Sequence, residues 1–210
     1  MTLQAIFITS FIVAFSGAMM PGPLMTVTIS ETPRRGFFTG PLLIAGHGLL
    51  ELALVLALIL GLGPFLRQDL VFIITAMAGS AVLLWMAFGM FKALPGLSLH
   101  SPSNQSAKYN PVAAGALLSI INPYWTIWWV TIGLGYILQS LKLGTWGVVS
   151  FFSGHILADL VWYSLISWGI WKGKTLISDR LYRWMIGACA LFLVGFALLF
   201  ARAGFQKLVA

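Results

Sequence analysis

Charged residues are sparse along the chain and leave long apolar tracts between them. Four tracts contain no charged residue: 1–30, 70–91, 109–141 and 184–201. Two further tracts, 36–66 and 143–171, contain one charged residue each, Glu51 and Asp159, near the middle of the tract. Because a helix needs about 20 residues to cross a bilayer, each of these six tracts is long enough to form one transmembrane helix.

The pattern predicts an all-α integral membrane protein with a single transmembrane domain over residues 1–210. We expect six spans at these approximate positions: 3–30, 37–62, 70–91, 110–138, 144–171 and 182–203. Composition agrees, because 60% of the residues are hydrophobic and 8% are charged, whereas soluble domains are about one quarter charged. Six helices use nearly the whole chain, which leaves no room for a soluble catalytic or nucleic-acid-binding domain.

Positive charge is distributed unevenly between the loops. The chain has 12 Lys and Arg residues against 5 Asp and Glu residues. Eight of the Lys and Arg residues fall in the first, third and fifth loops, and four fall on the other side. The positive-inside rule therefore places these three loops in the cytoplasm and both termini outside. No Lys or Arg precedes the first apolar region, so we expect a transmembrane segment there and not a cleaved signal peptide.

Cysteine content and missing motifs exclude several kinds of chemistry. The single cysteine, Cys189, excludes a disulfide scaffold, a Cys-pair redox centre and a Cys-pair zinc site. The chain has no Walker sequence for ATP binding, which leaves ion gradients as its energy source. We expect no cofactor and no enzymatic activity. A hydrolase built on Ser153 and His155 is disfavoured, because a spacing of two points these side chains to different sides of one helix.

A short motif occurs twice. Residues 46–52 read Gly-His-Gly-Leu-Leu-Glu-Leu and residues 154–160 read Gly-His-Ile-Leu-Ala-Asp-Leu, which agree at five of seven positions, one of them conservatively. Each copy lies in the second helix of its half. We expect two three-helix repeats, 1–92 and 110–210, joined by a linker loop over 93–109. Because three is odd, the second repeat enters the membrane from the opposite face, so the repeats are inverted, as in many secondary transporters.

Proline interrupts the first helix of each expected repeat. Pro21, Gly22 and Pro23 lie in the first span, and Asn122 and Pro123 lie in the fourth. Proline lacks an amide donor and clashes with the preceding turn. In lipid, a break is stable only against protein or a water-filled cavity, where the freed amides can bind a carboxylate. A packing kink is the alternative interpretation.

Glu51 and Asp159 each bring a carboxylate to the expected middle of the bilayer. Such a charge is costly in lipid, so both side chains should face the interior of the helix bundle. His47 and His155 precede these acids by four residues, which places each pair on one helix face. Three interpretations remain open: each histidine neutralises its own carboxylate, the pairs relay protons, or the two faces together form a cation site.

Motifs along the whole chain add a family resemblance. They are Pro21-Gly22-Pro23, Arg34-Arg35-Gly36, Gly40, Asn122-Pro123, Asp159 with Trp162-Tyr163, and Gly187 with Gly195. With these motifs the chain resembles the LysE/RhtB family of bacterial amino-acid exporters. The resemblance implies a six-helix protein of the bacterial inner (plasma) membrane that exports amino acids or similar small zwitterionic metabolites. It implies the proton gradient as the driving force.

One position departs from the pattern of that family. Many members have a lysine after the Asn-Pro pair, whereas this chain has Tyr124, followed by Trp125, Trp128 and Trp129. A missing cation and a dense aromatic face favour a less anionic or more aromatic substrate, since ring faces attract ammonium groups. Packing or anchoring of these rings in the membrane is the alternative.

The leading hypothesis is an antiporter in which Glu51 and Asp159 alternate between a substrate ammonium group and a proton, while the broken helices receive the substrate carboxylate. The alternative is a divalent metal cation transporter, because two imidazoles and two carboxylates are a suitable ligand set. No further Asp, Cys or Met ligand surrounds the pairs, which argues against metal. A Gly36-x-x-x-Gly40 spacing is compatible with a homodimer contact or with a loop boundary.

The expected partners are the lipid bilayer, a small-molecule substrate and protons, with no nucleic acid. We assign no metal site. The candidate binding residues are Pro21, Gly22, Pro23, His47, Glu51, Asn122, Pro123, Tyr124, His155 and Asp159.

Overall fold

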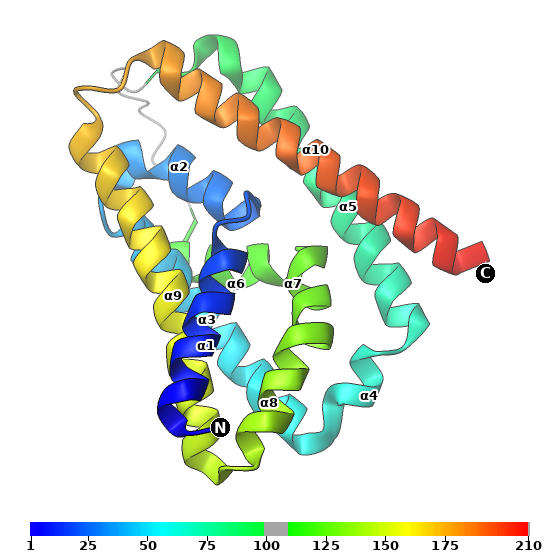
Figure 1. The fold of residues 1–210 in the computed structure, drawn as a ribbon. Helices are drawn as coiled ribbons and strands as arrows, with labels where there is room; N and C mark the ends of the chain where they lie inside the picture. The colour runs from blue at the N-terminus through cyan, green and yellow to red at the C-terminus, as the bar shows by residue number, and fades with distance from the viewer. Residues whose placement is uncertain (99–108, 210) are drawn as a thin grey trace.

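The computed structural model describes residues 1–98 and 109–209, and this part of the chain is helical without a strand (Figure 1). Four helices within it are long and apolar enough to cross a membrane. They are α3 (Thr39–Ala57) with its continuation through η1 (Leu58–Leu62) and α4 (Gly63–Leu66), α5 (Asp69–Ala93) with η2 (Leu94–Gly96), α9 (Gly144–Gly173), and α10 (Asp179–Val209). The number rises to six if each of two bent helix pairs forms one span.

The two bent pairs correspond to the expected first and fourth spans. Their helices are α1 (Leu3–Ala18) with α2 (Pro23–Arg35), and α6 (Pro111–Ile120) with α7 (Pro123–Trp128), which continues through η3 (Trp129–Gly133) and α8 (Leu134–Leu141). The first pair is bent by 72° and the second by 65°. Most of the linker expected over 93–109 falls on residues 99–108, which lie outside the described residues.

The sequence at each bend explains where the second helix begins. Pro23 is the first residue of α2, after Gly22 as N-cap, and Pro123 is the first residue of α7, after Asn122 as N-cap. Proline suits this position, because the amide of the first helical residue lacks an intrahelical acceptor in any case. Asn122 Oδ1 accepts a hydrogen bond from the Tyr124 amide at 3.1 Å, whereas Gly22 has no side chain to cap α2.

The helices of the two halves are interleaved. α1 packs along α9, and α3 packs against α6, while α5 and α10 lie side by side (Figure 1). Glycine permits two of these contacts. A Cβ on Gly46 would lie 1.7 Å from the Val112 carbonyl oxygen in α6, and a Cβ on Gly154 would lie 2.5 Å from the Phe7 carbonyl oxygen in α1. The first glycine of each copy of the repeated motif therefore permits a close contact with a helix of the other half.

A tightly packed core fills the space between α1, α3, the α7–η3 segment and α9. Its members include Ile6, Val55, Trp129 and Phe151, each at most 1% exposed. Side chains of this size immobilise the helices that surround Glu51, which is itself 1% exposed.

The Gly46 contact yields a first testable prediction. Gly46→Ala should destabilise the protein by about 1–3 kcal/mol, because the new methyl group forces α3 and α6 apart. Gly195→Ala in α10 is the matched control, since a Cβ there meets nothing within 4 Å. The control should leave stability unchanged or raise it slightly, because alanine favours a helix by about 1 kcal/mol over glycine. Thermal unfolding of both variants in detergent measures the difference, and equal melting temperatures would contradict the described packing.

Candidate functional site

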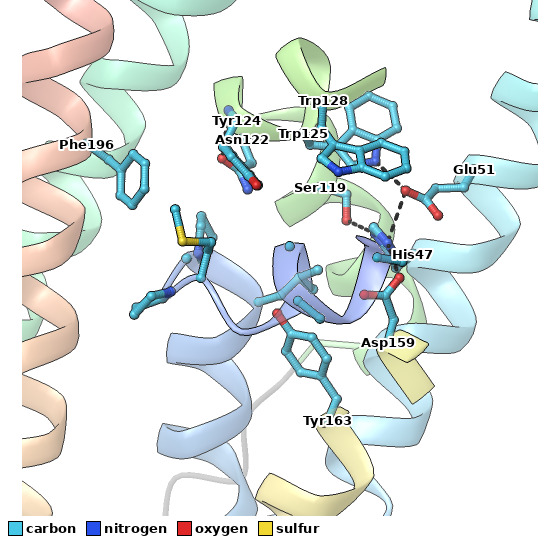
Figure 2. Close-up of a pocket in the computed structure, with 18 of the residues that line it drawn as sticks. His47, Glu51, Ser119, Asn122, Tyr124, Trp125, Trp128, Asp159, Tyr163 and Phe196 are labelled. Carbon is cyan, nitrogen blue, oxygen red and sulfur yellow. Dashed lines mark hydrogen bonds and ion pairs between the residues drawn. The ribbon is translucent and has the colours of Figure 1, made fainter. Parts of the chain in front are cut away.

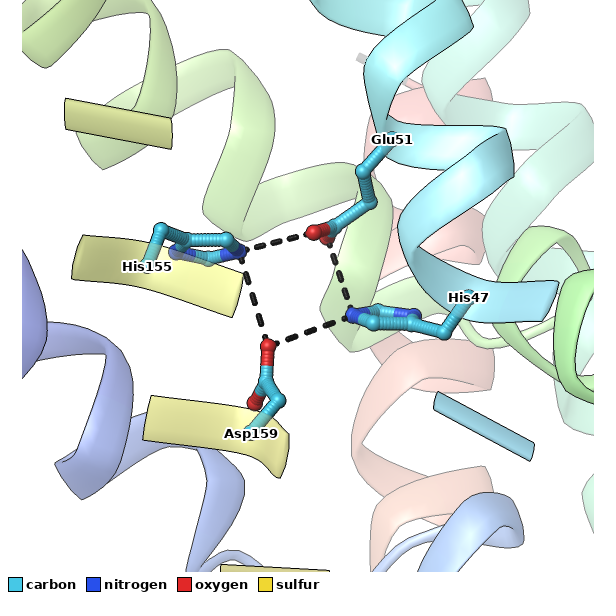
Figure 3. A group of neighbouring side chains, drawn as sticks. All are labelled: His47, Glu51, His155 and Asp159. Carbon is cyan, nitrogen blue, oxygen red and sulfur yellow. Dashed lines mark hydrogen bonds and ion pairs between the residues drawn. The ribbon is translucent and has the colours of Figure 1, made fainter. Parts of the chain in front are cut away.

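Four buried side chains from two helices form one cluster. His47 and Glu51 come from α3, and His155 and Asp159 come from α9 (Figure 3). Their nitrogen and oxygen atoms lie within 4.8 Å of one another. The two copies of the repeated motif, 108 residues apart in the sequence, thus meet in space.

The shortest contacts in this cluster cross between the helices. Glu51 Oε2 lies 2.8 Å from His155 Nε2, and Glu51 Oε1 lies 3.2 Å from His47 Nε2. Asp159 Oδ2 lies 3.4 Å from His47 Nε2 and 3.7 Å from His155 Nε2. Each carboxylate is closer to the histidine of the other helix. The pairs within each helix that the spacing of four predicts are present, and each carboxylate also pairs with the histidine of the other helix.

Two tryptophans hold Glu51 in place. Trp125 Nε1 and Trp129 Nε1 both donate to Glu51 Oε1, at 2.9 and 2.8 Å. Both side chains come from the segment after the second bend, four residues apart and on one helix face. Their role was not expected from the sequence, where we considered only packing, anchoring or contact with a ligand. The spacing of four was the signal available, and nothing in it pointed to Glu51.

Ser119 fixes the orientation of the His47 ring. The Ser119 hydroxyl donates to the Gly115 carbonyl oxygen at 2.7 Å, and its oxygen lies 2.7 Å from His47 Nδ1. Because the single hydroxyl proton serves the Gly115 carbonyl oxygen, we assign the donor role in the second contact to Nδ1. His47 therefore carries a proton on Nδ1 and turns Nε2 toward Glu51 and Asp159. Ser119 was also missing from the residues expected from the sequence.

His155 lies in an aromatic enclosure. Its ring centroid lies 4.7 Å from that of Trp128, 5.5 Å from that of Trp129 and 5.9 Å from that of Phe151. In the described part of the chain, His155 Nδ1 has no hydrogen-bond partner, and neither does Asp159 Oδ2. The cluster thus combines a firmly bonded Glu51 with less fully bonded atoms on α9.

A cavity adjoins the cluster at the place where the two bends meet. It contains about 770 Å³ of space not filled by protein atoms, a volume that includes its open mouth. Nine of the ten candidate residues line it: Pro21, Gly22, Pro23, His47, Glu51, Asn122, Tyr124, His155 and Asp159. The tenth, Pro123, packs instead against α5, where a Cβ on Gly79 would lie 2.7 Å from its ring.

Apolar and aromatic residues complete the cavity wall. Figure 2 shows Tyr124, Trp125 and Trp128 on one side and Tyr163 of α9 on the opposite side, with Phe196 of α10 facing them. Leu83 of α5 and Leu193 of α10 also line the cavity. These α5 and α10 residues could not be predicted from the sequence, because the membrane-spanning parts of both helices are apolar on all sides.

The polar groups of the cavity differ in charge between its two ends. Glu51 and Asp159 supply anionic oxygens, and no lysine or arginine occurs among the described residues that line the cavity. At the bends, a Cβ on Gly22 would lie 3.7 Å from Asn122 Nδ2, so the amide of Asn122 is next to the start of α2. Amides in the first turn of a helix lack intrahelical acceptors, and that end of the helix favours anions.

A second polar cluster lies outside the cavity and binds the C-terminal end of α2 to neighbouring segments. The buried Glu31 pairs with both Arg34 and Arg35, and Arg35 Nη2 donates to the Tyr109 carbonyl oxygen at 2.9 Å. Burial and the Glu31 carboxylate raise the pKa of the Tyr109 hydroxyl to about 12. Lys174 Nζ of the α9–α10 connection donates to the Pro33 carbonyl oxygen at 3.3 Å. Arg35, which the sequence analysis places in the first loop, thus connects α2 to the segment before α6, and Lys174 connects α2 to the segment after α9.

Could the cluster hold a metal? Imidazole and carboxylate are suitable ligands for transition metals. However, each histidine points Nε2 at carboxylate oxygens at hydrogen-bond or ion-pair distance, and two indole N–H groups already bind Glu51 Oε1. This arrangement suits protons shared between nitrogen and oxygen, and it provides no support for the metal alternative.

Bent helices around an interior cavity, with buried charges at its wall, define this molecule as a multi-pass membrane protein of the transporter class. The model of the LysE type translocator family matches residues 15–204, and the chain belongs to this family. The resemblance expected from the motifs is thereby confirmed. The chain is 30% identical over 208 residues to the chemotactic transduction protein ChpE of Pseudomonas aeruginosa, a match that covers 93% of this chain and 98% of ChpE. No solved structure shows a significant match.

Proposed function

We propose that this translocator is a secondary active exporter of amino acids or similar small zwitterionic metabolites, located in the bacterial inner membrane and driven by the proton gradient. The observation that carries the proposal is the cavity between the two bends. It joins an anionic cluster on α3 and α9 to the start of α2, which has no side-chain cap, and to the side-chain amide of Asn122. A small molecule with an ammonium group and a carboxylate matches these two ends.

The helix packing supports an inverted repeat as the framework of this transporter. Exchanging the two halves exchanges the α1–α9 contact with the α6–α3 contact and leaves the α5–α10 and α3–α9 contacts in place. Gly46 and Gly154 have the same role in the two exchanged contacts. In transporters with inverted repeats, the substrate site lies where the repeats meet, near the midplane.

The cavity wall also favours a class of side chain on the substrate. Aromatic rings form much of the wall, and the described lining has no lysine or arginine that could pair with a second carboxylate. A neutral amino acid with an apolar or aromatic side chain therefore fits better than an acidic one.

Alternating access would arise from movement of α5 and α10 as one unit. These two helices pack mainly against each other, whereas α1, α3, α6 and α9 are locked together by close contacts at glycines. Leu83, Leu193 and Phe196 on the α5–α10 pair form one wall of the cavity. A shift of this pair would change the opening of the cavity while leaving the four-residue cluster intact.

Transport into inverted membrane vesicles tests the proposal. Vesicles that contain the protein should accumulate labelled neutral amino acids when a pH gradient is imposed, acid inside. Accumulation should disappear when an ionophore collapses the gradient and in vesicles without the protein. Accumulation of divalent metals without amino acids would refute the proposal and favour the metal alternative. Accumulation that does not respond to the gradient would refute proton coupling.

A further inference from the structure

The two carboxylates of the cluster differ in how fully they are bonded. Glu51 Oε1 accepts from the indoles of Trp125 and Trp129, and Oε2 lies 2.8 Å from His155 Nε2. An indole N–H is only a donor. A proton on Oε1 would therefore face two further protons, and the ionised form of Glu51 is the one that these contacts stabilise.

Asp159 has none of these fixed donors. Its contacts within the cluster are the ion pairs of Oδ2 with the two histidines at 3.4 and 3.7 Å, and Oδ2 has no hydrogen-bond partner in the described part of the chain. The side chain is buried yet lines the cavity, and Tyr163 lies one turn further along α9 on the same wall. Asp159 can thus gain or lose a proton without displacing a bonded donor.

His47 is placed to share that proton. Its Nδ1 proton is committed to Ser119, and its Nε2 lies between Glu51 Oε1 and Asp159 Oδ2. When both carboxylates are ionised, Nε2 must carry a proton to be a donor. When Asp159 is protonated, Nε2 can instead accept from its hydroxyl group. One proton therefore moves between Nε2 and Oδ2 while the bond from Nδ1 to Ser119 stays the same, and Nε2 can donate to Glu51 Oε1 only when it carries that proton.

We propose that the exchangeable proton resides on the Asp159–His47 pair, whereas Glu51 stays ionised and serves as the positioning residue that holds both histidines. On the basis of the proposed function, the substrate ammonium group displaces this proton from Asp159. The proton leaves through the cavity and the ammonium group takes its place beside the carboxylate. The two acids of the repeated motif thus have different roles, although their positions in the sequence are equivalent.

The groups that can influence this proton are few. Within the described residues, the titratable side chains that line the cavity are His47 and Glu51 from α3, Tyr124 from α7, and His155, Asp159 and Tyr163 from α9. The stretches of α1, α2, α5, α6 and α10 that line it contribute apolar residues and Ser119. Any proton that is gained or lost in the cavity must therefore be gained or lost by one of these six side chains.

Infrared difference spectroscopy tests the proton site without a substrate. Acidification of the purified protein should produce the carboxylic acid C=O band of a buried side chain. The band should be lost in Asp159→Asn, remain in Glu51→Gln, and return at a shifted frequency in Asp159→Glu. The other acids, Glu31, Asp69 and Asp179, contribute equally to all spectra and cancel in the comparison. Loss of the band in Glu51→Gln, or its persistence in Asp159→Asn, would overturn the assignment.

Proton release on substrate binding tests the second step. In weakly buffered detergent solution, the wild-type protein should release protons when a neutral amino acid is added. Glu51→Gln should still release them at saturating amino acid, and Asp159→Asn should release none. Release from Asp159→Asn would overturn the displacement step. If the wild-type protein binds no amino acid while the infrared assignment holds, the proposed substrate class is wrong and the proton site stands.

Discussion

Replacement of Glu51 by leucine is expected to destabilise the protein by about 3–5 kcal/mol and to abolish transport. The leucine has roughly the right volume, but it leaves two indole N–H groups and two histidines without their shared partner. Loss of one member of a buried charged network has a cost of this size. Thermal unfolding in detergent and the yield of monodisperse protein measure the effect.

Two further variants separate the bonds of Glu51 from its charge. Glu51→Gln keeps an acceptor for the indoles, so it should insert and fold, with transport reduced at least about tenfold because the histidines lose their anion.

Adding Trp125→Phe and Trp129→Phe to Glu51→Leu removes two of the unpaired donors. That triple variant should be more stable than Glu51→Leu alone, by about 1–3 kcal/mol. If it is less stable, the indole contacts are not the source of the loss.

The second large effect is expected at Asn122. Asn122→Asp keeps a good N-cap for α7 but replaces an amide donor by an anion at the end of the cavity that should receive the substrate carboxylate. We expect KM for a neutral amino acid to rise at least about tenfold, which corresponds to 1.4 kcal/mol, while the melting temperature stays near that of the wild type. Concentration-dependent uptake into inverted vesicles measures the change.

The chain offers a matched control for this substitution. Asn110 is the N-cap of α6, where its side chain accepts from the Val112 amide at 2.8 Å, and it does not line the cavity. Asn110→Asp therefore makes the same chemical change at an equivalent helix position. Its KM should equal that of the wild type. Similar effects at both positions would show that the change acts through the helix ends and not through the substrate.

The sequence was sufficient to predict much of the fold and the charged part of the site. Charge spacing located the helices, and buried charge in lipid marked Glu51 and Asp159. Their histidine partners followed from a spacing of four. The packing of the helices could not be predicted in the same way. A helix that is apolar on all sides has no periodic pattern to show which face meets protein, so the contacts of α5 and α10 had no sequence signal.

The hydrogen-bond partners in the site could not be predicted from the sequence either. Trp125, Trp129 and Ser119 are common residue types in membrane helices, and packing or anchoring is the usual role of the two tryptophans. Their contacts with Glu51 and His47 depend on the angle of the second bend and on the distance between α3 and α6. Those quantities arise from side chains of several helices together, and no local pattern encodes them.

The interleaved packing has a consequence for biosynthesis. The main partners of α1 and α3 are α9 and α6, which the ribosome completes after the whole first half of the chain has emerged. Trp125, Trp129 and His155, which hold Glu51, are all made after Glu51 itself. The nascent first half must therefore stay in the membrane with Glu51 paired to His47 alone and with the surface at Gly46 not yet covered by α6. Helices already inserted then have to admit α6 and α9 between them, so the cavity is among the last parts of the protein to form.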